Sequence, residues 1–375
     1  MAFIPYSKQT ISDEDIQSVV EVLQSDFLTT GPKVKAFEEA IASYCGAKYC
    51  ISVANATAGL HLISLILLQP QDKVLTTPNS FLATSNAILY AKAKPIFIDI
   101  AHDGNIDLDL CEEALQKDST IKALYGVHFG GNPLNQEKLK YLKERYNITI
   151  VEDCAHSIGA TFTGIKSGSC QCSDASVFSF HPVKGLTTGE GGAVTTNCQA
   201  TYEKLLTLRS HGMQSRSDIA PWMYDMTELG FNYRLTDIAC ALGLSQLKKL
   251  NSFLYLRRAI AKRYDDYFND SAIISPLYAF THNSAYHLYV VKIAFEKLKI
   301  TKKAFVLKMR EKNIGLQYHY IPINQQPYYK NLGYGNEVMP EMDEYYNQAI
   351  SLPIYPNLSQ EEQHYVLECM KELLV

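Results

Sequence analysis

Residues 174–197 read DASVFSFHPVKGLTTGEGGAVTTN, two short apolar runs joined by a loop that carries one lysine and several glycines. The runs 175–180 and 193–196 predict two buried strands. Lys184 lies in the loop between them. A lysine at the end of a sheet commonly reaches into solvent, and this stretch alone favours that arrangement no less than burial. If the amine is buried, its pKa falls and it becomes a nucleophile that can form an imine with a carbonyl.

Upstream of this stretch, apolar strand patterns alternate with amphipathic helix patterns. The expected strands cover 49–53, 73–76, 95–100, 121–129 and 148–151. This alternation predicts an α/β fold with right-handed crossovers and a large, mostly parallel sheet. Such a sheet binds ligands at the carboxyl ends of its strands.

The pattern changes near residue 250. Two helices are expected at 239–250 and 255–268, and short strand candidates follow, notably 287–293. We therefore expect two domains. The first is a large cofactor-binding α/β domain over 1–250, and the second is a smaller α+β domain over 251–375.

The composition argues against several classes of partner. The chain has 375 residues and a formal net charge of −4, without a basic run, which argues against nucleic acid and an anionic membrane. Its first residues lack the pattern of a signal peptide, and the apolar run at 60–68 is too short to span a bilayer. The nine cysteines form no CxxC pair, so we expect reduced thiols, a cytoplasmic location and no metal site.

Two positions at the ends of predicted strands could bind parts of a cofactor. Ala56 and Thr57 begin a helix directly after a strand, where free amides and the helix dipole suit a phosphate. A plain N-cap is the more common arrangement there. Asp153 follows the strand at 148–151, with His156 three residues further on, and its carboxylate can pair with a protonated ring nitrogen. The alternative for Asp153 is another helix cap.

Three further candidates are each ambiguous when taken alone. Ser179 could donate to a phosphate or bond to the backbone. Phe81 could stack on a planar cofactor, although this segment alone favours a core phenylalanine. Asn232, in the segment GFNYRL at 230–235, could anchor a subunit contact or belong to the solvated start of a helix.

The combination is more informative than any single residue. A desolvated lysine, an aspartate at a strand end and a threonine at a helix start are what a pyridoxal phosphate site needs. There Lys184 forms the imine, Asp153 keeps the pyridine nitrogen protonated and the helix start at Thr57 holds the phosphate. No GxGxxG follows a predicted strand and no GxxxxGK[ST] occurs, which weighs against a dehydrogenase or an NTPase.

Over essentially its full length the sequence resembles the sugar-nucleotide aminotransferases of the DegT/DnrJ/EryC1/StrS type, which are fold-type I pyridoxal phosphate enzymes related to aspartate aminotransferase. The segments that carry the resemblance are TTGP at 29–32, NATA at 55–58, EDCAH at 152–156, FSFHPVK at 178–184, GEGG at 189–192, RSHG at 209–212 and GFNYR at 230–234.

The resemblance implies a role for each candidate. Lys184 would carry the cofactor and move the proton between the two reacting carbons, and Asp153 would contact the pyridine nitrogen. The remaining cofactor contacts implied are Ala56, Thr57 and Ser179 at the phosphate, His156 near the ring oxygen, Phe81 on the ring face and Asn232 at the phosphate of the neighbouring subunit. The last assignment implies a homodimer with shared active sites.

Within the family, segments such as 179–184 and 209–213 look most like the subgroup that aminates C4 of a UDP-linked 4-keto-6-deoxy-N-acetylhexosamine for pseudaminic acid-type glycans. We therefore expect an aminotransferase with L-glutamate as its amino donor. The implied substrate contacts are Tyr6, Phe27, Leu28 and Thr29 near the entrance, with His319 and Tyr320 from the small domain. The alternatives are an aminotransferase for a different nucleotide keto-sugar (at C3 or with the other C4 configuration), a sugar dehydratase that uses pyridoxal phosphate, and a cofactor-binding regulator without turnover.

Overall fold

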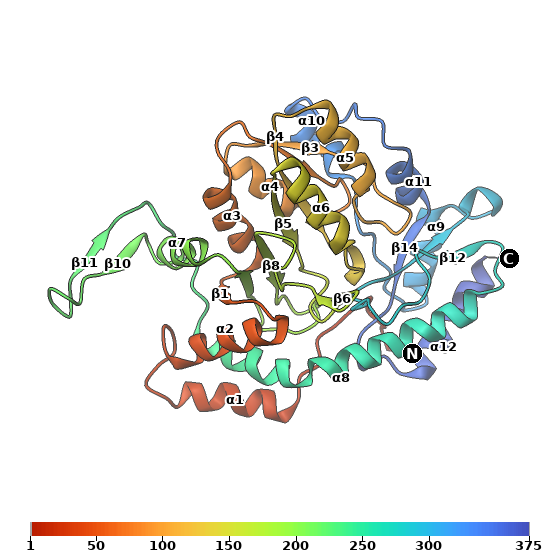
Figure 1. Ribbon diagram of the computed structural model, residues 1–375. Helices are drawn as coiled ribbons and strands as arrows, with labels where there is room; N and C mark the ends of the chain where they lie inside the picture. The colour runs from red at the N-terminus through yellow and green to blue at the C-terminus, as the bar shows by residue number, and fades with distance from the viewer. Residues whose placement is uncertain (1, 375) are drawn as a thin grey trace.

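A seven-stranded sheet forms the centre of the computed structural model, which describes residues 2–374 (Figure 1). The strand order is β1-β9-β8-β5-β4-β2-β3. The strands are β1 (Tyr49–Val53), β2 (Lys73–Thr76), β3 (Lys94–Phe97), β4 (Ile121–Val127), β5 (Thr149–Asp153), β8 (Ala175–Ser179) and β9 (Gly192–Thr196). β9 runs antiparallel to both of its neighbours, and the other pairings are parallel. The predicted α/β fold with a mostly parallel sheet is confirmed.

Helices cover both faces of this sheet, so its strands are apolar on both sides. The alternation of β8 illustrates this: Val177 packs in the cluster that includes residues of α3, whereas Phe178 packs on the other face with residues of α2 and α8. The helices of this part of the chain are α1 (Asp13–Leu23), α2 (Pro32–Cys45), α3 (Ala56–Leu67), α4 (Leu82–Tyr90), α5 (Leu108–Lys117), α6 (Gln136–Tyr146), α7 (Gln199–Arg209) and α8 (Asp237–Phe268). Within residues 2–374, no helix combines the length and the apolar character needed to cross a membrane.

Some predicted boundaries need correction. β3 and β4 end earlier than expected, at Phe97 and Val127. After β4 the chain turns into a short 3₁₀ segment, Phe129–Gly131, in which Gly130 has a φ of 64°, a conformation that glycine adopts without strain. β5 runs further than expected, so Asp153 is the last residue of the strand rather than the residue that follows it.

The prediction of separate helices at 239–250 and 255–268 is wrong, because α8 is one helix of 32 residues. Asn251 and Ser252 are weak helix formers. The next residues, Phe253 and Leu254, are buried, and this packing outweighs local propensity. The expected domain boundary at residue 250 falls inside this helix. The division into two domains stays a prediction, and its outer limits, residues 1 and 375, lie outside the described residues.

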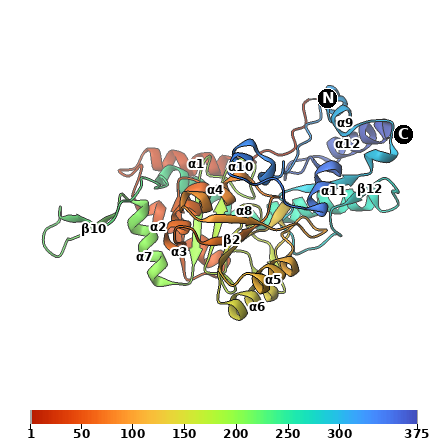
Figure 2. The ribbon, with the colours of Figure 1, turned by 90° about the horizontal axis from the view of Figure 1, so that it is seen from above.

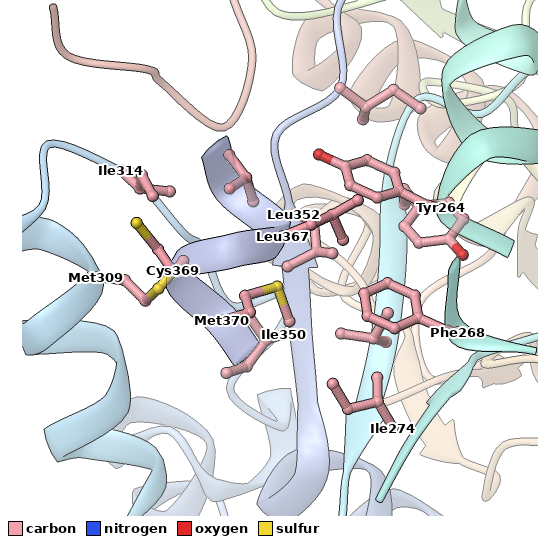
Figure 3. Packing of buried hydrophobic residues seen from close by; sticks show 14 of the residues in the cluster. Tyr264, Phe268, Ile274, Met309, Ile314, Ile350, Leu352, Leu367, Cys369 and Met370 are labelled. Carbon is pink, nitrogen blue, oxygen red and sulfur yellow. The ribbon is translucent and has the colours of Figure 1, made fainter. Parts of the chain in front are cut away.

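The C-terminal part of the chain has its own core, shown in Figure 3. Ile350 and Leu352 of the sheet meet Leu367 and Met370 of the last helix, and the end of α8 contributes Tyr264 to the same cluster. The elements are the antiparallel strands β12 (Ile274–Pro276), β13 (Tyr289–Ile293) and β14 (Ala349–Leu352) with the helices α9 (Lys302–Glu311), α10 (Pro327–Asn331), α11 (Pro340–Gln348) and α12 (Gln360–Leu373). α8 thus joins the two cores.

Two small hairpins were not predicted. One pairs β6 (Thr161–Phe162) with β7 (Ile165–Lys166). The other pairs β10 (Met213–Ser215) with β11 (Tyr224–Met226) and projects from the body of the molecule, as Figures 1 and 2 both show. Every residue of β10 and β11 is exposed, so burial periodicity, the main signal for strands, is missing there.

Candidate active site

A cavity of about 1140 Å³ opens at the carboxyl ends of β4, β5 and β8, where a parallel sheet binds ligands. Residues from both the N-terminal and C-terminal parts of the chain line it. Among them are ten predicted site residues: Tyr6, Ala56, Thr57, Phe81, Asp153, His156, Ser179, Lys184, His319 and Tyr320. The folded chain therefore brings together most of the residues expected to form the site.

Lys184 lies in the loop after β8, and its backbone amide donates to the carbonyl of His181 at 2.9 Å. Burial lowers the pKa of the Lys184 amine to about 8, and the carboxylate of Asp153 partly opposes this shift. A lysine with an ordinary pKa near 10.4 is almost fully protonated at pH 7, whereas one with a pKa of about 8 is neutral in roughly a tenth of molecules. Lys184 is therefore a partly neutral amine that faces a cavity.

This shift predicts how fast Lys184 reacts with an amine-directed acylating reagent in the cofactor-free protein. The rate should rise with pH and reach its midpoint near pH 8, because only the neutral amine is nucleophilic. Asp153→Asn should move the midpoint to lower pH, since it removes the charge that favours the ammonium. Mass spectrometry of the labelled peptide over a pH series measures both. A midpoint near 10.4 would contradict the burial of the amine.

The carboxylate of Asp153 lines the cavity and is held by two hydrogen bonds. Its side chain is 7 % exposed. One carboxylate oxygen accepts from the amide of Ala155 at 3.0 Å, and the other accepts from the hydroxyl of Thr84 at 2.7 Å. The hydrogen bond from the Ala155 amide closes a turn at which no helix begins, so the alternative of a helix cap is wrong, and Asp153 lines the cavity. Thr84 was not predicted, because it lies far away in the sequence, within α4.

The start of α3 offers backbone amides to the cavity. Asn55 is the N-cap, and its side-chain oxygen accepts from the amide of Ala58 at 2.9 Å. Ala56 and Thr57 follow in the first turn, where helix amides have no intrahelical acceptor. A Cβ at Gly192 would lie 2.7 Å from the nitrogen of Ala56, so only glycine allows β9 to approach this closely. The capping role thus belongs to Asn55, and the next two residues present an anion-binding helix end.

His156 and Tyr320 form an ordered hydrogen-bond chain. The amide of Gly130 donates to Nδ1 of His156 at 3.3 Å, so the ring proton of the neutral imidazole lies on Nε2. Burial, with nearby Lys184, lowers the pKa of His156 well below its ordinary value and keeps the ring neutral. Nε2 lies 3.2 Å from the hydroxyl of Tyr320 and donates to it, which leaves the hydroxyl proton of Tyr320 free to donate to a ligand.

His287 is a cavity-lining residue that the sequence did not predict. Its ring lies 4.4 Å from that of His156, centroid to centroid, and it is 3 % exposed. It precedes β13 in the C-terminal part of the chain. No motif marks it, and only the packing of that part against the large sheet brings it to the site.

Phe81 is not a core residue, which corrects the reading that its segment alone favoured. It is 60 % exposed, lines the cavity at the N-cap of α4, and its ring centroid lies 6.3 Å from that of Tyr320. An aromatic ring at an open cavity wall lacks the stabilisation that burial in the core would give it. This placement favours the ligand-stacking role.

Four predicted residues do not line the cavity of the same chain: Phe27, Leu28, Thr29 and Asn232. Asp237, at the start of α8, explains the position of the first three. Its amide donates to the carbonyl of Leu28, and its carboxylate accepts from the amides of Gly31 and Lys33, so this loop is held beside α8. Asn232 is exposed and pairs with Ser210 through the backbone.

Metal ligands are not grouped in the part of the chain that the structure describes: no three His, Cys, Asp or Glu side chains are placed to share an ion.

The mostly parallel sheet and the lysine-bearing cavity at its carboxyl edge agree with the predicted fold-type I α/β transferase, and solved aminotransferase structures share this fold. The chain belongs to the DegT/DnrJ/EryC1/StrS aminotransferase family, whose family model matches residues 9–371. The predicted family and enzyme class are thereby confirmed.

Individual relatives match along the whole chain. A UDP-4-amino-4,6-dideoxy-N-acetyl-beta-L-altrosamine transaminase of Campylobacter jejuni is 39% identical and covers 99% of this chain and 97% of its own length. Among solved structures, Helicobacter pylori PseC, an aminotransferase involved in the biosynthesis of pseudoaminic acid, superimposes with a TM-score of 0.93 at 32% identity over 99% of each chain. A putative sugar aminotransferase from Streptococcus pneumoniae, in its PLP-form, has a TM-score of 0.89 at 30% identity over 100% of each chain.

Proposed function

We propose that this chain is a pyridoxal phosphate-dependent aminotransferase that moves an amino group from L-glutamate to C4 of a UDP-linked 4-keto-6-deoxy-N-acetylhexosamine, for pseudaminic acid-type glycans. The observation that carries the proposal is the cavity in which Lys184, with its lowered pKa, faces the carboxylate of Asp153. The names of the Campylobacter and Helicobacter relatives support the sugar.

The residues of the cavity fit this cofactor. The amides of Ala56 and Thr57, approached closely by Gly192, would hold its phosphate, and Asp153 would pair with its ring nitrogen. Phe81 offers a ring face to a planar group. When bound, pyridoxal phosphate supplies an electron-accepting ring that stabilises negative charge on the carbon next to the amine.

The side chains divide the remaining work. Nζ of Lys184 takes a proton from a reacting carbon and returns it to another, which a pKa of about 8 allows near neutral pH. The Tyr320 hydroxyl, oriented by His156, donates a hydrogen bond into the cavity. His319 is held by the Ser351 hydroxyl at 2.8 Å and packs against the ring of Tyr6 at 5.5 Å, a polar and aromatic wall suited to a sugar.

Product analysis tests the proposed substrate. The purified enzyme, loaded with pyridoxal phosphate and L-glutamate, is given UDP-linked 4-keto-6-deoxy sugars. We expect one product whose mass shows exchange of the ketone oxygen for an amine and whose NMR spectrum places that amine at C4. An amine at C3 would point to a different aminotransferase, and loss of water without an amine would point to the dehydratase. Binding of the cofactor without any exchange would support the regulator.

The proposed enzyme works as a homodimer whose active sites are shared. The β10–β11 hairpin projects from the body (Figure 2). Asn232 lies in the segment between β11 and α8 and is exposed outside the cavity of its own chain. Trp222, within the hairpin, is 78 % exposed, and Leu229, just after it, is 80 % exposed. Large apolar side chains exposed in one segment are typical of protein interfaces, and a second copy would cover them.

Replacing Trp222 and Leu229 together with serine should therefore shift the protein towards monomer and weaken its cofactor binding. Light scattering after gel filtration gives the mass, and circular dichroism confirms the fold. Val338→Ser is the matched control, because Val338 is 91 % exposed on the C-terminal part of the chain. A double variant that stays dimeric with unchanged cofactor affinity would contradict the role of the hairpin.

We also propose a cytoplasmic location. All nine cysteines are free thiols, and all but Cys198 are buried. Unpaired cysteines in this number are typical of a reducing compartment.

A further inference from the structure

Thr84 is a buried hydroxyl next to the site that does not line the cavity. It lies in the first turn of α4 and is 1 % exposed. Its Oγ1 donates to Oδ2 of Asp153 over 2.7 Å, in a bond that joins positions 69 residues apart. The hydroxyl is placed on the carboxylate and away from the ligand space, so its influence on the site has to act through Asp153.

The two hydrogen bonds of Asp153 differ in what they fix. The amide of Ala155 donates to Oδ1 from the same turn, so this bond does not fix Asp153 relative to other elements of the fold. Thr84 binds Oδ2 from helix α4 and sets the rotation of the carboxylate relative to the cavity. Each carboxylate oxygen keeps a further lone pair, so both bonds can persist while the carboxylate accepts a proton donor from a ligand.

We propose that Thr84 is a positioning residue that holds the Asp153 carboxylate in the orientation that binds the protonated ring nitrogen of the cofactor. This inference rests on the proposed function. A carboxylate that can rotate freely loses geometric match with a single N–H donor, and a charge-assisted hydrogen bond depends strongly on that geometry.

The same bond connects two walls of the cavity. α4 begins directly after Phe81, so Thr84 lies one turn from the ring that lines the site. Anchoring that turn to Asp153 fixes the distance between the ring and the carboxylate. A planar cofactor would have to satisfy both at once, one at its face and the other at its edge.

Cofactor affinity tests the proposal without turnover. Thr84→Val keeps the shape and deletes the donor, and Thr84→Ser keeps the donor. Equilibrium dialysis of the cofactor-free protein with pyridoxal phosphate gives Kd, and the pH dependence of the bound cofactor's visible band reports the environment of its ring nitrogen. We expect Kd of Thr84→Val to be roughly ten- to a hundredfold higher and its pH profile shifted, with both near wild type in Thr84→Ser.

Thr207→Val is the matched control. Thr207 is also a buried helix threonine, 7 % exposed, but its hydroxyl donates to the carbonyl of Glu203 at 3.1 Å, away from the cavity. We expect its Kd and pH profile to equal those of the wild type. Thr84→Ala, which leaves more room, is measured in parallel in case the valine prevents folding, and the same loss is expected of it.

The outcomes distinguish the positioning role of Thr84 from the proposed function of the protein. Wild-type affinity and an unchanged pH profile in Thr84→Val or Thr84→Ala would overturn the positioning role while leaving the proposed function intact. An equal loss in Thr84→Ser would overturn it too, since the donor is retained there. A wild-type protein that fails to bind pyridoxal phosphate would instead remove the proposed function, and this inference with it.

Discussion

Lys184→Ala is expected to lower kcat by roughly 10⁴-fold or more while the protein stays folded. The substitution removes the amine that would both carry the cofactor and move the proton, and no neighbouring amine can replace it, since Lys184 is the one lysine or arginine among the described residues that line the cavity. Fold retention is expected because burial opposes the charge of this amine, as its lowered pKa shows, so its removal relieves a desolvation cost. Steady-state kinetics and thermal unfolding measure the two effects.

Lys302 provides a matched control for this prediction. Burial lowers the pKa of Lys302 to about 8 as well, yet its ammonium packs over the rings of Tyr318 and Tyr346 and does not line the cavity. Lys302→Ala should therefore keep kcat within a few-fold of wild type. Turnover that survives in Lys184→Ala, or that disappears equally in both variants, would contradict the assignment of the reacting amine.

Asp153→Asn has the second largest expected effect, a loss of roughly 10²- to 10³-fold in kcat. The substitution keeps the shape and one of the two acceptor atoms, those for the Ala155 amide and the Thr84 hydroxyl, but it removes the negative charge, so a protonated ring nitrogen would no longer be stabilised. The bound cofactor's absorption spectrum over a pH series should change in parallel with the rate, because both depend on the same proton.

The same substitution at Asp174, which directly precedes β8, is the control. The carboxylate of Asp174 accepts from the amide of Ile150 at 2.8 Å and pairs with Lys143 at 2.9 Å, away from the cavity. Asp174→Asn should cost some stability and leave kcat unchanged. An Asp153→Asn variant that is no more impaired than Asp174→Asn would show that the charge of Asp153 has no part in the reaction.

The central sheet could be predicted because its signals are local. β1 and β2 match their expected ranges residue for residue, since a short apolar run bounded by turn residues suffices to mark a buried strand. α8 could not be predicted as one helix, because Asn251 and Ser252 suggest a break that only tertiary packing overrides. The β10–β11 hairpin is exposed along its length, so it carries no burial periodicity at all.

The residues of the candidate site likewise divide into those that local sequence signals predict and those that only tertiary contacts place. Asp153 and Thr57 could be located because they lie at the end of a predicted strand and the start of a predicted helix, and Lys184 because it lies in the loop between two predicted strands. Thr84 and His287 could not, since each reaches the site through contacts between elements far apart in the sequence. The sequence predicts the loop that carries Phe27 at the entrance of the active site. Asp237 instead holds this loop beside α8, an interaction that no sequence motif indicates.

The central claim is that Lys184 and its surroundings exchange an amino group between a donor and a nucleotide-linked keto sugar. The most direct measurement is the visible spectrum of the protein loaded with pyridoxal phosphate, recorded before L-glutamate, after it, and after a UDP-linked 4-keto-6-deoxy-N-acetylhexosamine. We predict that glutamate removes the visible band of the bound cofactor and that the keto sugar restores it. A band that forms but that neither compound changes would contradict the account.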